Sequence, residues 1–111
     1  MPAATQDLSE IAARENRFVS EKLSEVADLL AGQVADPFRV RAYREAAEYV
    51  AGMKDGIHKV LDDRGTSGLG ALPTIGTSIA GAIAELVQTG DLGLIRRLRG
   101  DVDPEKVFQT I

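Results

Sequence analysis

Apolar residues recur at intervals of three and four positions along most of the chain, which is the spacing of one face of an α-helix. No stretch shows the sustained alternation of a half-buried strand. Over residues 8–31 the apolar positions form one helical face. The polar pair Glu15 and Asn16 interrupts it and allows a break between a short arm and a main helix. Gly32 predicts the end of this segment.

A second helix is predicted over residues 37–51. Asp36 can accept hydrogen bonds from the free amides of the first turn, and Pro37 suits the first helical position, where no N–H is needed. The apolar residues of this segment, including Phe38 and Tyr49, are expected to face the core.

Similar start and stop residues predict three further helices, from Asp55 to Gly65, from Thr77 to Thr89 and from Asp91 to Leu98. One more turn is expected after Gly65, and Asp103 with Pro104 begins another helix. Because every connection is short and no strand is predicted, we expect an all-α fold, a small bundle of helices packed orthogonally.

Composition limits the kinds of chemistry that this chain can perform. With 111 residues and 44% apolar content, it has the size of one domain with a modest core. The absence of cysteine excludes disulfides and thiolate zinc sites, and the one histidine, His58, is expected at the surface. No apolar run approaches the length of about 20 residues that spans a bilayer, so we expect a cytoplasmic protein without membrane contact.

The charge distribution does not by itself indicate a nucleic-acid partner. The net charge is −4, whereas nonspecific affinity for DNA comes mainly from lysine and arginine. Basic residues are nevertheless grouped, at Arg39, Arg41 and Arg44 and again at Arg96, Arg97 and Arg99. A solvated basic face is the alternative explanation for the first group.

The segment LPTIG, residues 72–76, precedes the helix predicted from Thr77 and has the form of an anion site. Unpaired amides and the positive end of the helix dipole favour negative charge at a helix N-terminus. Gly76 allows a phosphate to approach closely. An ordinary turn between two helices is the alternative interpretation.

Two segments together resemble a known family. LPTIGTSIAGAIAELVQTG is similar to the helix-hairpin-helix in the N-terminal domain of family X DNA polymerases, which is related to the lyase domain of DNA polymerase beta. DPFRVRAYREAAEYV resembles the second helix of that domain in bacterial members. The resemblance covers residues 16–100. Residues 1–15 are then an N-terminal extension, helical or partly disordered, and residues 101–111 begin a linker or further helix.

This resemblance implies nonspecific, weak binding to the DNA sugar-phosphate backbone, in DNA repair or replication. The phosphate-binding amides correspond to the hairpin and first helical residues, Thr74, Gly76, Thr77 and Ser78. The backbone carbonyls that hold a monovalent cation in the family correspond to Gly70, Leu72 and Ile75. Tyr43 matches the tyrosine near the DNA end, and Arg39, Arg41 and Arg44 share its helix.

This sequence departs from the family pattern at the turn. Thr74 stands where the family usually has glycine. A Pro-Gly pair suits a type II turn, whose third residue needs positive φ, whereas Pro-Thr fits type I. We therefore expect a type I turn with a rotated amide, or else a strained turn.

A second departure concerns catalysis. In the family a lysine forms a Schiff base with the sugar aldehyde, and its position here is Ala82. A neighbouring phosphate-binding lysine corresponds to Ser78. We therefore expect no enzyme, no catalytic residue and no cofactor apart from the hairpin cation.

Two other functions stay open besides DNA binding. The domain can have kept the fold as a protein-interaction or structural module, or it can retain residual 5′-deoxyribose phosphate lyase activity. The partner is then DNA, another protein, or a C-terminal domain beyond residue 111.

Overall fold

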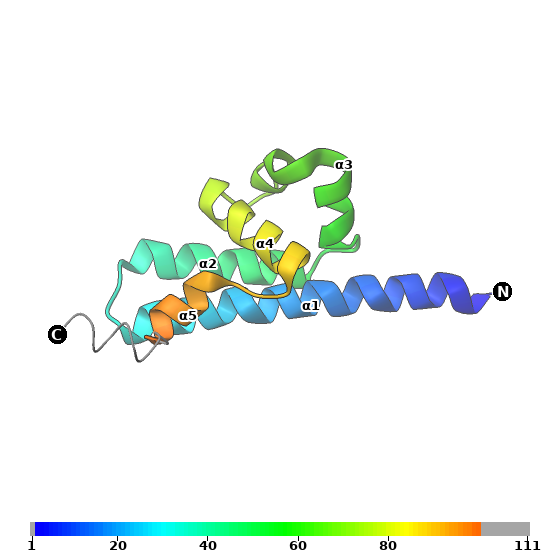
Figure 1. Cartoon of the computed structure of the whole chain (residues 1–111). Helices are drawn as coiled ribbons and strands as arrows, with labels where there is room; N and C mark the ends of the chain where they lie inside the picture. Colours follow the sequence, from blue (N-terminus) through cyan, green and yellow to red (C-terminus); the bar gives the residue numbers. More distant parts are fainter. Residues whose placement is uncertain (1, 101–111) are drawn as a thin grey trace.

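The structure is a computed structural model that describes residues 2–100, with side chains from residue 10 onward. This part of the chain holds five helices and no strand (Figure 1), so the all-α prediction is confirmed. The helices are α1 (Pro2–Gly32), α2 (Pro37–Ala51), α3 (Ile57–Gly70), α4 (Thr77–Thr89) and α5 (Gly93–Arg99). The helix expected at Asp103 lies outside the described residues.

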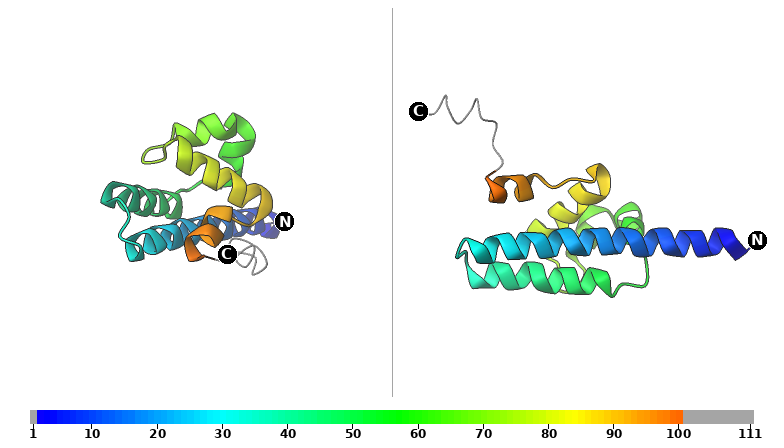
Figure 2. Two further views of the ribbon diagram at one scale, coloured as in Figure 1. Left: turned by 60° about the vertical axis from the view of Figure 1, so that its left-hand side comes forward. Right: turned by 90° about the horizontal axis from the view of Figure 1, so that it is seen from below.

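Helices α1 and α2 form an antiparallel pair, whose contact is the most extensive one among the five described helices (Figure 2). Ser20 Oγ on α1 donates to the carbonyl oxygen of Ala47 on α2 at 2.8 Å. Both helices contribute fully buried side chains to one core, among them Val19, Leu23, Val26 and Leu30 from α1 and Ala46, Ala47 and Val50 from α2. The N-terminal part of α1 extends past the other helices.

Helices α3 and α4 pack against each other above this pair (Figure 1). Gly65 adopts φ 68°, in the left-handed region, and separates the main part of α3 from one short further turn, as predicted. The side chains of α4 that enter the core include Ile79, Ile83 and Leu86. None of the helices over residues 2–100 combines the length and the apolar character that crossing a bilayer requires.

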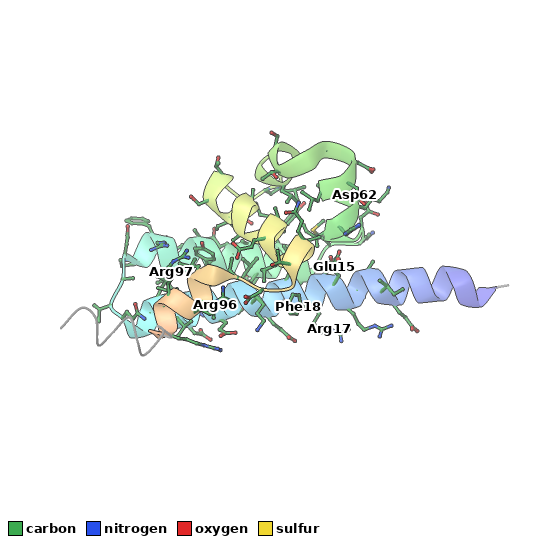
Figure 3. All side chains as sticks on the ribbon, viewed as in Figure 1. Glu15, Arg17, Phe18, Asp62, Arg96 and Arg97 are labelled. Carbon is green, nitrogen blue, oxygen red and sulfur yellow. The ribbon has the colours of Figure 1, made fainter. Side chains whose placement is uncertain are left out.

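Polar side chains of α1 accept hydrogen bonds from the first backbone amides of α3. Asn16, which is 4% exposed, accepts from the Ile57 amide at 2.8 Å and donates to the Asp55 carbonyl at 2.9 Å. Glu15 Oε1 accepts from the His58 amide at 2.9 Å. Glu15 is labelled in Figure 3, on the side of α1 that meets α3. These two side chains satisfy the first amides of α3 from a distant part of the sequence.

Two expectations at these positions are therefore wrong. Asp55 does not cap α3, because the N-cap residue of α3 is Gly56, which has no side chain that could cap the helix. The pair Glu15 and Asn16 does not break the first helix either. α1 is continuous through both residues, since their polar groups face α3 and bond there.

The start of α2 agrees with its sequence signals, but the position of Phe38 does not. Asp36 Oδ1 accepts from the Phe38 amide at 2.9 Å, and Pro37 occupies the first helical turn, as predicted. The Phe38 side chain is 75% exposed, so its predicted burial is wrong. The buried face of α2 begins only at Tyr43, and the Arg41 guanidinium lies 5.9 Å from the Phe38 ring centroid.

Helix α5 is attached to the rest of the molecule by polar contacts at both ends. At its start, Glu85 Oε2 on α4 accepts from the Gly93 amide at 2.8 Å, and Asp91 Oδ1 accepts from the Leu92 amide at 2.9 Å. At its end, Arg99 pairs with Glu25 on α1. The predicted capping by Asp91 is therefore wrong: the N-cap residue of α5 is Leu92, and the first helical amide, that of Gly93, is bonded by the Glu85 carboxylate of another helix.

Replacing Asn16 by alanine is expected to destabilise the fold by about 2–3 kcal/mol, because two hydrogen bonds disappear and the amide of the fully buried Ile57 loses its acceptor. Urea denaturation followed by far-UV circular dichroism measures this change. Arg17→Ala, on the exposed side of the same helix, is the control and is expected to stay within about 0.5 kcal/mol of the wild type. Equal stabilities of the two variants would contradict the role given to Asn16.

Candidate nucleic-acid interface

The hairpin between α3 and α4 contains a closed four-residue turn. The Ile75 amide donates to the Leu72 carbonyl at 3.2 Å, and Pro73 and Thr74 are the central residues. Thr74 has φ 66°, the left-handed conformation that a type II turn requires at its third residue. The type I prediction is therefore wrong, and the alternative prediction, a strained turn, is confirmed. The backbone keeps a geometry that suits glycine, and a β-branched residue holds it under strain.

The N-terminus of α4 is open to solvent. Its N-cap residue is Gly76, which has no side chain that could cap the helix. The first intrahelical hydrogen bond runs from the Ala80 amide to the Gly76 carbonyl at 2.9 Å. Within residues 2–100, no protein acceptor meets the amides of Thr74, Gly76, Thr77, Ser78 and Ile79. A helix end with unpaired amides attracts an anion.

Helices α2, α3 and α5 differ from α4 in this respect. Side-chain oxygens accept from their first amides, and these oxygens belong to Asp36 for α2, to Asn16 and Glu15 for α3, and to Glu85 for α5. The hairpin residues Gly76, Thr77 and Ser78 are instead exposed. Among these four helices, α4 therefore offers its amides to an external ligand.

A groove of about 430 Å³ lies between α2 and the hairpin; we call it the hairpin groove. It is lined by Arg39, Ala42, Tyr43, Thr74, Gly76, Thr77, Ser78 and Ile79. It brings together every residue that the sequence proposed for DNA contact except Arg41 and Arg44. Ala42 and Ile79 were not expected there, because small and apolar side chains carry no sequence signal for a binding surface.

Tyr43 forms part of the wall of this groove and not a projecting contact. Its side chain is 4% exposed and belongs to the hydrophobic core. Arg39, one helical turn before it, is exposed and brings a positive charge to the same groove. Among the described residues, Arg39 forms no ion pair.

Arg41 and Arg44 lie on a different surface. Both line a separate hollow of about 470 Å³, together with Val34, Pro37 and Val40 among others. The Arg44 guanidinium pairs with Asp28 on α1 at 3.0 Å. Residues two positions apart on a helix do not face the same side, which explains why Arg39 and Arg41 separate.

The backbone carbonyls proposed for a monovalent cation lie at the end of α3 and in the turn. The Leu72 carbonyl accepts the hydrogen bond of the turn, whereas the carbonyls of Gly70 and Ile75 accept none from the described residues. Carbonyl oxygens of this kind fit a hard cation. Within residues 2–100 there is no cluster of three or more acidic, histidine or cysteine side chains that would compete as a metal site.

Ala82, the position that the resemblance to family X polymerases aligned with a Schiff-base lysine, is not accessible as a reactive site. Ala82 is 9% exposed and packs in the core, so only a methyl group stands there. Ser78 is exposed at the groove but has no amine. His58 is at the surface, as predicted, with Nε2 at 2.8 Å from Asp62 Oδ2, and it does not line the groove.

The sequence matches the family model described as a helix-hairpin-helix domain over residues 14–92. This match covers more than half of the chain, so the protein belongs to the helix-hairpin-helix family. Domains of this family generally bind DNA. No curated protein and no solved structure gives a significant match.

Two glycines at the ends of α4 are expected to respond differently to substitution by alanine. Gly76 has φ −92° and open space where a Cβ would stand, and the preference of an N-cap for glycine over alanine is largely offset by the lower entropy of the unfolded alanine chain, so Gly76→Ala is expected to change stability by no more than about 0.5 kcal/mol. Gly90 has φ 74°, so Gly90→Ala is expected to cost about 1–2 kcal/mol. Urea denaturation of both variants checks this, and a larger loss for Gly76→Ala would contradict the described turn.

Proposed function

We propose that this domain binds DNA without sequence specificity, by holding a backbone phosphate in the hairpin groove. The observation that carries the proposal is that Arg39 from α2 and the unpaired amides at the start of α4 line the same groove. Membership of the helix-hairpin-helix family supports it. Amides and one guanidinium recognise a phosphate oxygen and carry no information on base sequence.

The electrostatics of the groove imply weak binding with a modest dependence on salt. Amides are neutral and release no counterions when a phosphate binds, and the groove has one basic side chain, Arg39. The logarithm of the binding constant is therefore expected to fall with the logarithm of salt concentration with a slope of about −1. The net charge of −4 further limits the affinity.

The finer part of the proposal follows the resemblance to family X polymerases. We propose that the domain is of the DNA polymerase beta N-terminal type and serves DNA repair or replication. The carbonyls of Gly70, Leu72 and Ile75 are the groups that would hold a monovalent cation. Such a cation adds positive charge at the hairpin, beside the phosphate-binding amides.

A second candidate function is protein interaction, which one observation favours. Val34 is 92% exposed and Phe38 is 75% exposed, and both are large apolar residues at the junction of α1 and α2. Val34 lines the hollow that also holds Arg41 and Arg44. This surface is separate from the hairpin groove, so the two functions are distinguishable by mutation.

Arg39→Glu is expected to weaken binding to a gapped DNA duplex by about tenfold or more, because a charge-assisted contact to phosphate becomes a repulsion. Fluorescence anisotropy of a labelled duplex at low salt measures the affinity. Arg17→Glu changes the net charge equally but lies on α1, pointing away from α3 and α4 in Figure 3, so it is the matched control.

Arg17→Glu is expected to change the affinity by about twofold or less, since it alters only the overall field. Equal losses for the two charge reversals would contradict a localised site at the hairpin groove. The protein-interaction function would be favoured if the wild type bound no DNA and instead bound a protein partner whose binding is lost in Phe38→Ala.

We also propose that the domain has no lyase activity, because the position of the Schiff-base lysine holds the buried Ala82. Incubation with a 5′-deoxyribose phosphate end and sodium borohydride is expected to trap no covalent protein–DNA adduct. An authentic lyase treated in parallel shows that trapping works. An adduct that persists after Lys54 and Lys59 are changed to arginine would show that another amine reacts.

A further inference from the structure

The Thr74 side chain makes a contact that glycine, the residue usual at this position in the family that the sequence resembles, could not make. Thr74 Oγ1 donates to the Glu45 carbonyl on α2 at 3.3 Å, across 29 positions of sequence. Among the described residues, this is the one hydrogen bond that joins α2 to any part of residues 57–100. Helix α2 otherwise packs mainly on α1.

Hollows lie on both sides of this hydrogen bond. On one side is the hairpin groove, where the α2 residues are Arg39, Ala42 and Tyr43. On the other side is a hollow of about 600 Å³, which Glu48, Tyr49 and Gly52 of α2 line together with Leu72 of the turn. Because Glu45 lies between these two sets along α2, the helix and the hairpin approach each other closely at Thr74 and stand apart on either side.

We propose that Thr74 is a positioning residue that sets the width of the hairpin groove. Its hydroxyl holds the turn against the middle of α2, so that the amides of Gly76 to Ser78 face Arg39 at a fixed separation. This inference rests on the proposed function, since that separation matters for a phosphate held from both sides. It also explains why a strained residue occupies the turn.

Glycine would adopt φ 66° at this position without strain, but it has no hydroxyl to donate to Glu45. Threonine strains the backbone and supplies the contact. Serine, valine and glycine at position 74 therefore separate the two properties. Serine keeps the hydroxyl, valine keeps the shape and the strain without the hydroxyl, and glycine removes both the hydroxyl and the strain.

The distance between α2 and α4 tests the contact directly. The chain contains no cysteine, so nitroxide labels at Glu48→Cys on α2 and Gln88→Cys on α4 report a single pair of sites. Double electron–electron resonance is expected to give the same narrow distribution for the parent and for Thr74→Ser. Thr74→Val and Thr74→Gly are expected to shift or broaden it.

Affinity for the gapped duplex is measured on the same position-74 variants without labels. Thr74→Val and Thr74→Gly are expected to bind about three- to tenfold more weakly, and Thr74→Ser within about twofold of the wild type, because a misplaced charge-assisted contact loses part of its strength. Thermal unfolding is recorded alongside. Valine retains the backbone strain and glycine relieves it, so the two variants are expected to differ in stability. A loss of affinity that both share is therefore not caused by a change in stability.

The outcomes separate the two proposals. Unchanged distance distributions in the valine and glycine variants overturn the positioning role, even where Arg39→Glu still weakens DNA binding. Broadened distributions restored by serine support it, and they do so independently of DNA. If the distributions broaden while Arg39→Glu and Arg17→Glu bind alike, the proposed function fails and Thr74 remains the contact that spaces α2 from the hairpin.

Discussion

The contact of Asn16 with the start of α3 is the interaction on which the rest of the structure depends. The buried carboxamide of Asn16 donates to the Asp55 carbonyl and accepts from the Ile57 amide, so both of its polar atoms are satisfied. The α1–α2 pair is held together by its own apolar interface, and α3 and α4 pack on each other. Asn16 joins these two parts, because only a correctly placed α3 lets a buried carboxamide bond fully. The hairpin groove lies between the same two parts.

The groups that accept hydrogen bonds from the first amides of each helix connect the fold to the proposed function. Helices α3 and α5 take their capping oxygens from other helices, and α2 takes its own from Asp36. The same dipole and the same unpaired amides exist at α4, but no side chain of the described residues satisfies them. In the proposed function, the ligand supplies the oxygen that a protein side chain supplies elsewhere. Binding then uses the physical interaction that stabilises the fold.

Much of the fold and part of the site could be predicted from local patterns. Asp36 with Pro37 and the glycine after Thr89 mark helix ends by their own backbone chemistry, and the structure agrees. Asp55 and Phe38 were misjudged because a cap or a buried face depends on what lies opposite. For Thr74, intrinsic preference favoured a type I turn, whereas the contact with Glu45 accompanies the left-handed conformation. Ordinary propensity yields to tertiary contact at such positions.

The sequence by itself determined the helical class, the order of the helices and the presence of a hairpin before α4, because periodicity, proline and glycine act within a few residues. Only the tertiary structure decided that Arg39 faces the hairpin while Arg41 and Arg44 face another surface. It also decided that Asn16 begins α3. The physical reason is that these features depend on the rotation of one helix against another, which many side chains fix together and no short segment encodes.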